Sequence, residues 1–581
     1  MSPSSLPAAP PRGAVAATRP LVARILRRPL LAAAVFAFAA AFAGIHGHSL
    51  WSPDEPREAQ MSREMLESGF SAMPTLGGEP FLEKPPLFFW LAAASYRVFG
   101  VSEAAERLPS VLFGALATLA AYSIARATGG RRAALVAAVF TASFSTFWSV
   151  GHRGINDVVL GAAVAGGHAL LVRARAMAEK GRALHCALGA GFCAGVAFMA
   201  KGVIGPVLLA GPPTIAWLVL RDGVVLRRVL PWLALSCAAF IAAFGVPWAV
   251  ALSHHPGGWK NVFDCTLGQV IGRVVGDEAV GPHNHPWWFY LQGGWGALVP
   301  WVAFLPAILV SPIQRLRMKR RPLLDAGLML LAGVLLLSIP SGKRNSYLFP
   351  LLPLAAAVPA DWFARLRVRE VFGRRFLQWT MALASVGGVA LFALAVSLAC
   401  GSATLAKLVA IPKLAPIAAA GASPANVVTA VAALALALWL GRIARRFRRD
   451  ATVRAAVREV VVFAAAGLVL SHAIGRPFLE PLNRLYPAAK SLAAAVPAGE
   501  PLLSYNGSET LRAMVPFYGG RRLIRIHSQD VLGEMAARGA RHLIELNDTK
   551  VKLPPDVAAR LTPIFSTPEV DGFDATVYEL R

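Results

Sequence analysis

Residues 108–125 read LPSVLFGALATLAAYSIA, and a second apolar run, AALVAAVFTASFSTFWSV, covers residues 133–150 after the basic segment RATGGRR. Neither run holds a charged side chain, and each is about as long as an α-helix must be to cross a bilayer. The pattern recurs along the chain and predicts an all-α polytopic membrane protein with about thirteen transmembrane helices. The thirteen runs lie at residues 29–45, 108–125, 133–150, 158–172, 187–200, 203–220, 229–252, 292–310, 323–339, 347–363, 378–399, 427–440 and 459–474.

The composition excludes an ordinary soluble protein. Of the 581 residues, 56% are hydrophobic and only 15% are charged, and the mean hydropathy is +0.54. A formal net charge of +26 would also suit a nucleic-acid-binding protein. The basic residues lie in short clusters between apolar runs, however, so no nucleic-acid partner is expected. The five cysteines form no CxxC pair, which argues against a disulfide scaffold or a zinc knuckle.

The basic residues indicate the orientation of the chain in the membrane. With the N-terminus inside, the seven inside segments hold 32 of the 58 basic residues, and the outside loops before residue 475 hold 13. This is the bias of the positive-inside rule. Counting the short apolar stretch 85–100 as a span would reverse it, so that stretch is expected to be an interfacial helix. Residues 1–28 are expected to form a disordered cytoplasmic tail.

The C-terminal region has a different composition from the rest. Short β-like runs at 501–505, 522–526, 541–545 and 575–580 alternate with helical patterns, which predicts a small soluble α/β domain over residues 475–581. Thirteen spans would place it outside. The transmembrane domain then covers residues 29–474.

The first outside loop, residues 46–107, concentrates the ionisable groups, with nine carboxylates. A loop that merely connects two spans can also be charged. Asp54 and Glu55, however, come within about ten residues of the first span, where partial desolvation suits a carboxylate to act as a base. We therefore expect both to be catalytic. Arg57 and Lys84 place cations in the same loop, as the binding of a phosphate requires.

Three further outside loops contribute polar side chains at the same level. Asp157 lies at the mouth of the fourth predicted span, where an unpaired carboxylate is costly. His283 and His285 precede the aromatic sequence PWWFY, and Lys343 and Tyr347 lead into the tenth span. Each of these residues alone is also typical of a snorkelling or interfacial side chain. Together they predict a site on the outer face, with Lys343 among its phosphate-binding cations.

In combination these residues resemble a known family, the membrane glycosyltransferases of the GT-C fold. Within it the chain is most similar to the bacterial branch that includes the lipid A aminoarabinose transferases and is related to the protein O-mannosyltransferases. The resemblance covers most of the first 365 residues. The segments that carry it are the Asp-Glu pair with REAQMSREMLESG, FLEKPPLFFWL, Asn156 with Asp157, the PWWFYL block and SGKRNSYLFPLLP.

The resemblance implies transfer of a sugar from a polyprenyl-phosphate carrier to a lipid, glycan or other envelope acceptor, with inversion at the anomeric carbon. The reaction would take place at the outer face of the bacterial cytoplasmic membrane. By this resemblance Asp54 is the general base, Lys84 and Tyr347 contact the donor phosphate with Arg57 beside them, and Asp157 orients the acceptor or shapes the site.

The resemblance leaves open whether the protein binds a metal. In relatives a histidine can join the glutamate of the EKPP segment, here Glu83, in binding a metal. The comparable stretch of this chain, TLGQVIGR, has Gln269 at about that place. His283 or His285 could substitute, so Glu83 and His283 are the candidate ligands, and no cofactor is expected to be required.

Two other functions suit parts of the pattern. A transporter or flippase of an anionic polyprenyl lipid would explain the spans and the cations, but it predicts charges within the membrane or broken helices related by repeats. A transferase of the same fold could act instead on protein or on a cell-wall polymer. The sequence identifies neither the sugar nor the acceptor.

Overall fold

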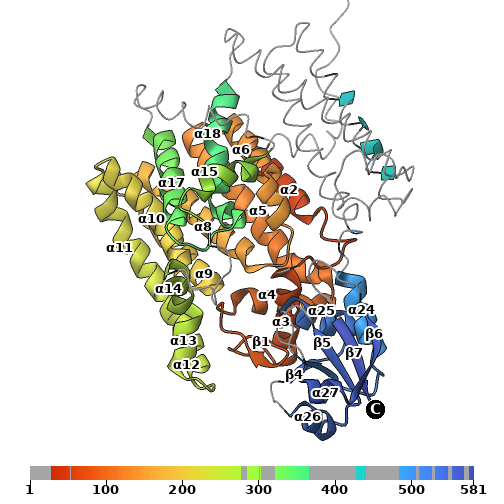
Figure 1. The fold of residues 1–581 in the computed structure, drawn as a ribbon. Helices are drawn as coiled ribbons and strands as arrows, with labels where there is room; N and C mark the ends of the chain where they lie inside the picture. The colour runs from red at the N-terminus through yellow and green to blue at the C-terminus, as the bar shows by residue number, and fades with distance from the viewer. Residues whose placement is uncertain are drawn as a thin grey trace, which may run out of the picture.

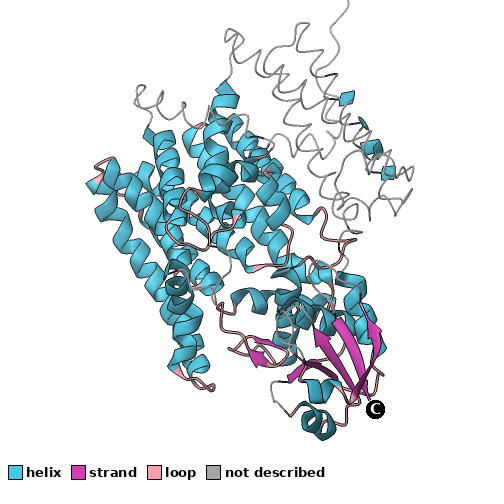
Figure 2. Ribbon diagram, in the orientation of Figure 1, coloured by secondary structure: helices cyan, strands magenta, loops and turns pink. Residues whose placement is uncertain are grey.

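The computed structural model describes residues 28–275 except 53 and 179, residues 284–365 except 300 and 302–320, scattered positions from 427 to 442, and most of 480–581. Gaps in the last part fall at 481–482, 484, 506–508, 527–529, 547–552 and 568–574. The described chain is mostly helical, and strands gather near the C-terminus (Figures 1 and 2). His283 and the predicted spans 378–399 and 459–474 lie outside the described residues, as do residues 1–27 of the predicted tail.

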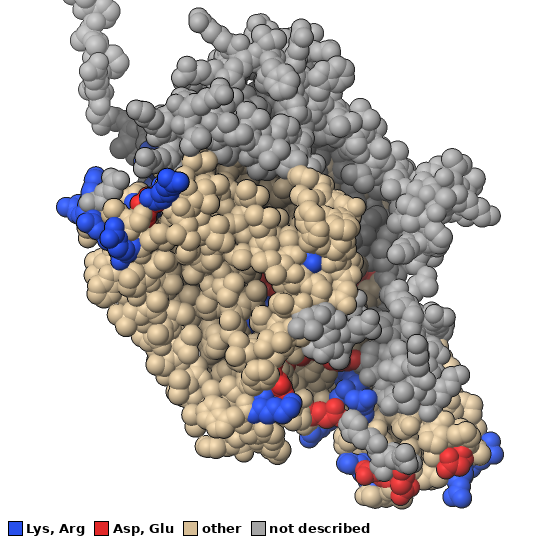
Figure 3. All heavy atoms as spheres, turned by 60° about the vertical axis from the view of Figure 1, so that its left-hand side comes forward, with Lys and Arg blue, Asp and Glu red and all other residues tan. Residues whose placement is uncertain are grey.

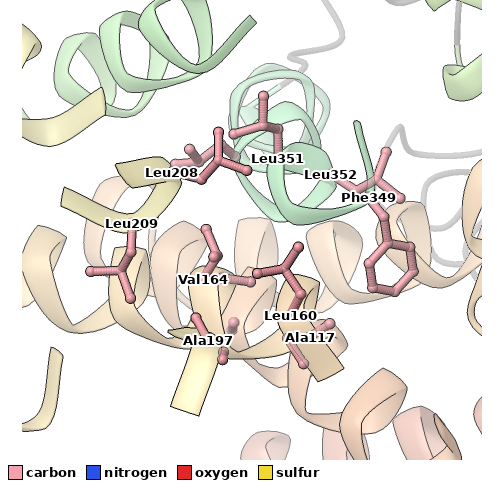
Figure 4. Packing of buried hydrophobic residues seen from close by; sticks show 14 of the residues in the cluster. Ala117, Leu160, Val164, Ala197, Leu208, Leu209, Phe349, Leu351 and Leu352 are labelled. Atoms are coloured by element: carbon pink, nitrogen blue, oxygen red, sulfur yellow. The ribbon is translucent and has the colours of Figure 1, made fainter. Parts of the chain in front are cut away.

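Two long helices, α5 and α8, form the centre of the helical part, and α9, α6 and α18 pack around them (Figure 1). Glycines allow close approach: a Cβ at Gly161 would lie 2.2 Å from the Phe349 ring, and one at Gly167 would lie 2.4 Å from Leu209. Figure 4 shows apolar side chains of several helices meeting in this core. The helices are α2 (Pro29–Phe42), α5 (Glu103–Thr128), α6 (Arg131–Ser143), α7 (Ser145–Val150), α8 (Asn156–Ala178), α9 (Leu184–Lys201), α10 (Ile204–Val219), α11 (Gly223–Phe240), α17 (Arg321–Ser338) and α18 (Leu352–Arg365).

Within the described residues, four helical segments are long and apolar enough to cross a membrane. They are Glu103–Thr128, Asn156–Ala178, Leu184–Lys201 and Gly223–Ser253. The last continues from α11 through a π-helical turn, η1 (Ile241–Gly245), into α12 (Val246–Ser253). The predicted span 133–150 is wrong in one respect, because the chain leaves the helical conformation at Phe144 and α6 and α7 are separate helices.

The surface agrees with a membrane protein. Figure 3 shows a broad face almost without charged side chains, with basic and acidic groups gathered towards its two ends. Many large apolar side chains are exposed, among them Phe192, Leu218, Leu235 and Phe244. Water would penalise such a surface, whereas lipid tails would not.

The first outside loop folds into a helix, a hairpin and a second helix. The helix α3 (Asp54–Glu67) has two carboxylates in its first turn, where the positive end of the helix dipole favours them. A short antiparallel pair, β1 (Thr75–Leu76) and β2 (Glu79–Pro80), leads to α4 (Leu87–Phe99). The helix predicted at 85–100 is thus confirmed. Downstream short elements are α13 (Trp259–Phe263), η2 (Asp264–Gly268), α14 (Gln269–Val275), α15 (Phe289–Gly293), η3 (Gly294–Leu298) and η5 (Asn345–Leu351).

Residues 485–581 form what we term the C-terminal sheet unit, a five-stranded sheet in the order β4-β3-β5-β7-β6. Strands β4, β3 and β5 are parallel, whereas β7 pairs antiparallel with β5 and β6. Side chains of β3 alternate between two cores: Leu502 packs on the α24 and α25 side, and Leu503 on the α26 side. All four predicted strands are present, and β6 was not predicted. The elements are α24 (Leu485–Ala495), β3 (Leu502–Tyr505), α25 (Glu509–Gly519), β4 (Leu523–Ile526), α26 (Val531–Ala537), β5 (His542–Leu546), α27 (Pro555–Ala558), β6 (Leu561–Ser566) and β7 (Ala575–Leu580).

Candidate active site

Asp54, the first residue of α3, lies between two arginines. Arg57 Nη2, one helical turn later, is 3.0 Å from Asp54 Oδ1, and Arg344 Nη1 is 2.9 Å from Asp54 Oδ2. Arg344 comes from the SGKRN loop, just before η5. The Asp54 carboxylate is therefore paired through both oxygens, on a side chain that keeps some exposure.

The cations around Asp54 keep it ionised. Burial by itself would raise the pKa of Asp54, but nearby positive charges outweigh burial and lower that pKa well below its ordinary value. These charges belong, in order of effect, to Lys84, Arg57, Arg344 and Arg153. Several cations thus converge on Asp54, although Lys84 and Arg57 also pair with Glu58 and Glu509.

The structure places Glu55 inside the fold, whereas the sequence predicted a partly desolvated carboxylate at the membrane surface. It is fully buried, and Arg107 Nε lies 2.7 Å from its Oε1. The backbone N–H groups of Trp51 and Gly154 also donate to its carboxylate, at 2.8 and 3.0 Å. Burial would raise the pKa of Glu55, yet the Arg107 charge and hydrogen bond outweigh burial and lower it. With its oxygens occupied inside the fold, Glu55 joins the start of α3 to the core, so its predicted catalytic role is corrected to a structural one.

Lys84 pairs with a carboxylate that the sequence did not single out. Its ammonium donates to Glu58 Oε1 in a close ion pair, and Asn156 Nδ2 donates to Glu58 Oε2 at 2.9 Å. Burial raises the pKa of Glu58 although the charge of Lys84 opposes that rise. Glu58 follows Asp54 by one helical turn, and this i, i+4 spacing was the only signal of it in the sequence.

Asp157 and Tyr347 meet at a second cation, Lys201, which the sequence reasoning also missed. The Lys201 ammonium donates to Asp157 Oδ1 and lies 4.9 Å from the centroid of the Tyr347 ring. Lys201 is the last residue of α9. Its position at the outer end of a predicted apolar run was an available signal, but such lysines commonly snorkel to the interface.

One cavity connects these groups. Its empty volume is about 810 Å³, and its polar wall holds Glu83, Lys84, Asp157, Lys201 and Tyr347. Lys84 pairs with Glu58, whose Oε1 lies 3.9 Å from Arg57 Nη2, so the cavity lies beside the Asp54 cluster. The remaining wall is largely apolar, with Leu160, Ile204, Leu208, Val270, Leu337, Pro340 and Pro350 among its residues.

His285 and Lys343, predicted from the fourth and fifth outside loops, contact neighbouring loop groups. His285 is exposed and stacks on Phe289 with 4.3 Å between ring centroids. The buried Lys343 ammonium donates to the His285 carbonyl at 2.8 Å and to that of Pro340, and desolvation lowers its pKa. Lys343 therefore holds the loop together, and its neighbour Arg344 is the residue that reaches Asp54. His283 lies outside the described residues.

The described residues do not build a metal centre. Glu83 and Gln269 line the same cavity, and Gln269 Oε1 has no hydrogen-bond partner among the described groups. In the part of the chain that the structure describes, no group of three His, Cys, Asp or Glu side chains could hold a metal. One carboxylate and one amide oxygen fall short of an ordinary protein metal site.

Comparison with solved structures shows which proteins share the fold. The structure matches crystal structures of ArnT from Cupriavidus metallidurans with TM-scores of 0.68 for the form bound to undecaprenyl phosphate and 0.70 for the apo form. The bound-form alignment covers 96% of this chain and 97% of that one at 21% sequence identity. The family model for dolichyl-phosphate-mannose-protein mannosyltransferases matches residues 83–248.

The sequence is similar to bacterial undecaprenyl phosphate-α-4-amino-4-deoxy-L-arabinose arabinosyl transferases. It is 32% identical to one from Pseudomonas aeruginosa over 364 residues, which are 60% of this chain and 62% of the relative. A relative from Serratia proteamaculans is 30% identical over 332 residues, 56% of this chain and 58% of the relative. The match thus spans less than two thirds of these relatives. The resemblance inferred from the motifs is confirmed.

Proposed function

We propose that the protein is an inverting glycosyltransferase that takes a sugar from a polyprenyl-phosphate donor. The observation that carries the proposal is the cavity next to Asp54, which has lysines on its polar wall and a largely apolar remainder. A phosphate attached to a long hydrocarbon needs a positively charged surface for the phosphate directly beside an apolar surface for the chain. The undecaprenyl phosphate carrier in the names of the relatives supports this donor class.

The phosphate would bind where the cations converge. Lys84 borders the cavity and the Asp54 cluster, and Arg57 has a buried Nε without a partner among the described residues. An arginine fork and an ammonium together neutralise a phosphodiester and stabilise the charge that grows on it as it leaves. Lys201 and Tyr347 border the same cavity and would contact the same group.

Asp54 would act as the general base. The acceptor hydroxyl gives its proton to Asp54 while its oxygen attacks the anomeric carbon, and the bond from that carbon to the phosphate oxygen breaks on the opposite face. The electron pair of that bond leaves with the carrier phosphate. In the free protein the surrounding cations hold the pKa of Asp54 low. A bound phosphate would neutralise part of this charge and raise the pKa towards the range of an effective base.

The relatives' names make an amino-pentose the first sugar to test. Lipid A is the first acceptor to test because the motifs of the chain resemble those of the lipid A aminoarabinose transferases. In this proposal the reaction takes place at the outer face of the bacterial cytoplasmic membrane, with the N-terminus inside and the C-terminal sheet unit in the periplasm. The basic residues, concentrated in the inside segments of the predicted topology, support this orientation.

A second acceptor class follows from one observation. The family model that matches residues 83–248 describes enzymes that glycosylate protein. Hydroxyl groups of serine or threonine would meet the same base, so the chemistry at Asp54 would not change.

Reconstitution tests the proposal. The purified protein in proteoliposomes would receive undecaprenyl phosphate-4-amino-4-deoxy-L-arabinose and either lipid A or envelope protein, and mass spectrometry would record the acceptor. A lipid A product larger by one amino-pentose supports the first assignment. Modified protein would favour the second, and no product with either acceptor would contradict both.

A further inference from the structure

The C-terminal sheet unit packs against the loop that carries Asp54. Helix α25 lies alongside α3 (Figure 1). The Leu50 N–H donates to the Tyr518 hydroxyl at 2.8 Å, and Arg63 Nη1 donates to the Pro516 carbonyl at 3.2 Å. These polar contacts lie on both sides of the first turn of α3, and Phe517 of α25 packs with Leu50 and Ala59 in a shared apolar cluster.

One contact of this interface reaches the candidate site. Glu509, the first residue of α25, accepts a hydrogen bond from Arg57 Nη1 at 2.6 Å, while Arg57 Nη2 donates to Asp54 at 3.0 Å. The guanidinium thus divides its two outer nitrogens between a carboxylate of the sheet unit and the candidate base. The Phe81 ring, 5.2 Å from the guanidinium carbon, covers one face of the group.

We infer that Glu509 is a positioning residue for Arg57 in donor binding, an inference that rests on the proposed function. A guanidinium is a rigid planar fork, so fixing one outer nitrogen fixes the direction of the others. Glu509 holds Nη1 and leaves only Nη2 to Asp54. The buried Nε has no hydrogen-bond partner among the described residues, so the two outer nitrogens alone fix the direction of the fork.

Removal of Glu509 has a defined consequence. Arg57 would keep Asp54 and Glu58, whose Oε1 lies 3.9 Å from Arg57 Nη2, and the nearby charge of Glu83. The fork can turn to bind the Asp54 carboxylate with two nitrogens, the arrangement that arginine and carboxylate favour. A donor phosphate would have to displace that pair, so it would bind more weakly.

Two substitutions separate positioning from simple electrostatics. Glu509→Ala removes the acceptor, and we expect about tenfold weaker binding of undecaprenyl phosphate to the full-length protein in detergent. Glu509→Gln keeps an acceptor oxygen and removes the negative charge, so binding should stay within about twofold of wild type or tighten. If the charge alone mattered, both variants would bind the anion more tightly. That result would overturn the inference.

A matched control lies in the same interface. Glu79 pairs with Arg512 of α25 at 2.8 Å and does not contact Arg57. Glu79→Ala removes an ion pair between the same two parts of the chain, so it reports how much donor affinity depends on the interface in general. We expect wild-type affinity, and a loss equal to that of Glu509→Ala would make Glu509 an ordinary interface residue.

A double-mutant cycle with Arg57→Lys completes the test. Lysine has no fork to orient, so Glu509→Ala should have no further effect in that background. Equal losses in both backgrounds would contradict a role through Arg57. Wild-type protein that binds no undecaprenyl phosphate would refute the proposed function itself, whereas wild-type binding with an unchanged Glu509→Ala variant would refute only this inference.

Discussion

Arg344 Nη1 lies 2.9 Å from Asp54 Oδ2, although 290 residues separate the two in the chain. The contact closes the site between the first outside loop and the SGKRN loop. It also shows which of two adjacent basic residues belongs to the site, because Lys343 turns inward to backbone carbonyls. In the proposed mechanism the donor phosphate would compete with Asp54 for the same guanidinium.

Substitution of Arg344 should weaken donor binding more than it harms folding. Arg344→Met removes one of the cations that attract the phosphate, and we expect kcat/KM for the donor to fall about tenfold to a hundredfold, the size of a lost charge-assisted contact of about 1.5–3 kcal/mol. The check is initial-rate kinetics in proteoliposomes at several donor concentrations. Lys343→Met is the comparison. It should lower thermal stability, and it should change kcat/KM for the donor, calculated per folded molecule, less than Arg344→Met does. The reverse ranking would refute the assignment.

The pH dependence should differ between free and donor-bound protein. The low pKa of Asp54 in the free protein means that it stays ionised down to about its ordinary value of 3.8 and below. It should therefore not limit kcat/KM on the acid side near neutral pH. In the complex the phosphate neutralises the cations and the pKa rises, so the acid limb of kcat should lie at higher pH than that of kcat/KM. Coincident limbs would contradict the proposed coupling.

Glu55 should matter for stability and not for chemistry. Arg107→Ala leaves the Glu55 carboxylate buried without its cation, which costs about 3–5 kcal/mol when a buried pair is broken. Thermal unfolding in detergent is the measurement, with the exposed pair Arg538–Glu534 as control, where Arg538→Ala should change little.

The stability that Glu55 contributes should also depend on pH. Since the pKa of Glu55 is lowered on folding, its contribution to folding stability is present above its unfolded pKa near 4.5 and is lost as pH falls below that value. A Glu55→Gln variant that folds normally but transfers no sugar would restore its catalytic role.

Lys201 should contribute to donor binding through the cavity. Lys201→Met keeps most of the length of the side chain and removes the positive charge that contacts Asp157 and the Tyr347 ring. We expect weaker binding of undecaprenyl phosphate, measured with the purified protein, and little change with undecaprenol, which has the chain but no phosphate. An equal loss for both lipids would mean that Lys201 only shapes the apolar wall.

The sequence predicted the parts of the fold and site that local patterns determine. Uninterrupted apolar runs predicted helices, and the charged first loop indicated Asp54, Arg57 and Lys84. The break at Phe144 escaped prediction because the run 133–150 is apolar throughout, and hydropathy does not report where a helix ends.

The pairings could not be predicted in the same way. Glu55 and Asp54 are chemically equivalent neighbours, and only the distant Arg107 makes one of them structural. Glu509 lies 452 residues from Arg57, in a region whose composition indicated only a small α/β domain. Such roles depend on tertiary contacts that no local spacing encodes.

The central claim is that Asp54 accepts the proton of the acceptor while the cations around it bind the donor phosphate. It is tested most directly with Asp54→Asn, by measuring sugar transfer and undecaprenyl phosphate binding on the same preparation. Asparagine keeps the shape of the side chain but cannot take the proton, so transfer should fall by at least a factor of about 100 while binding is retained or tightened. Transfer at the wild-type rate would contradict the account.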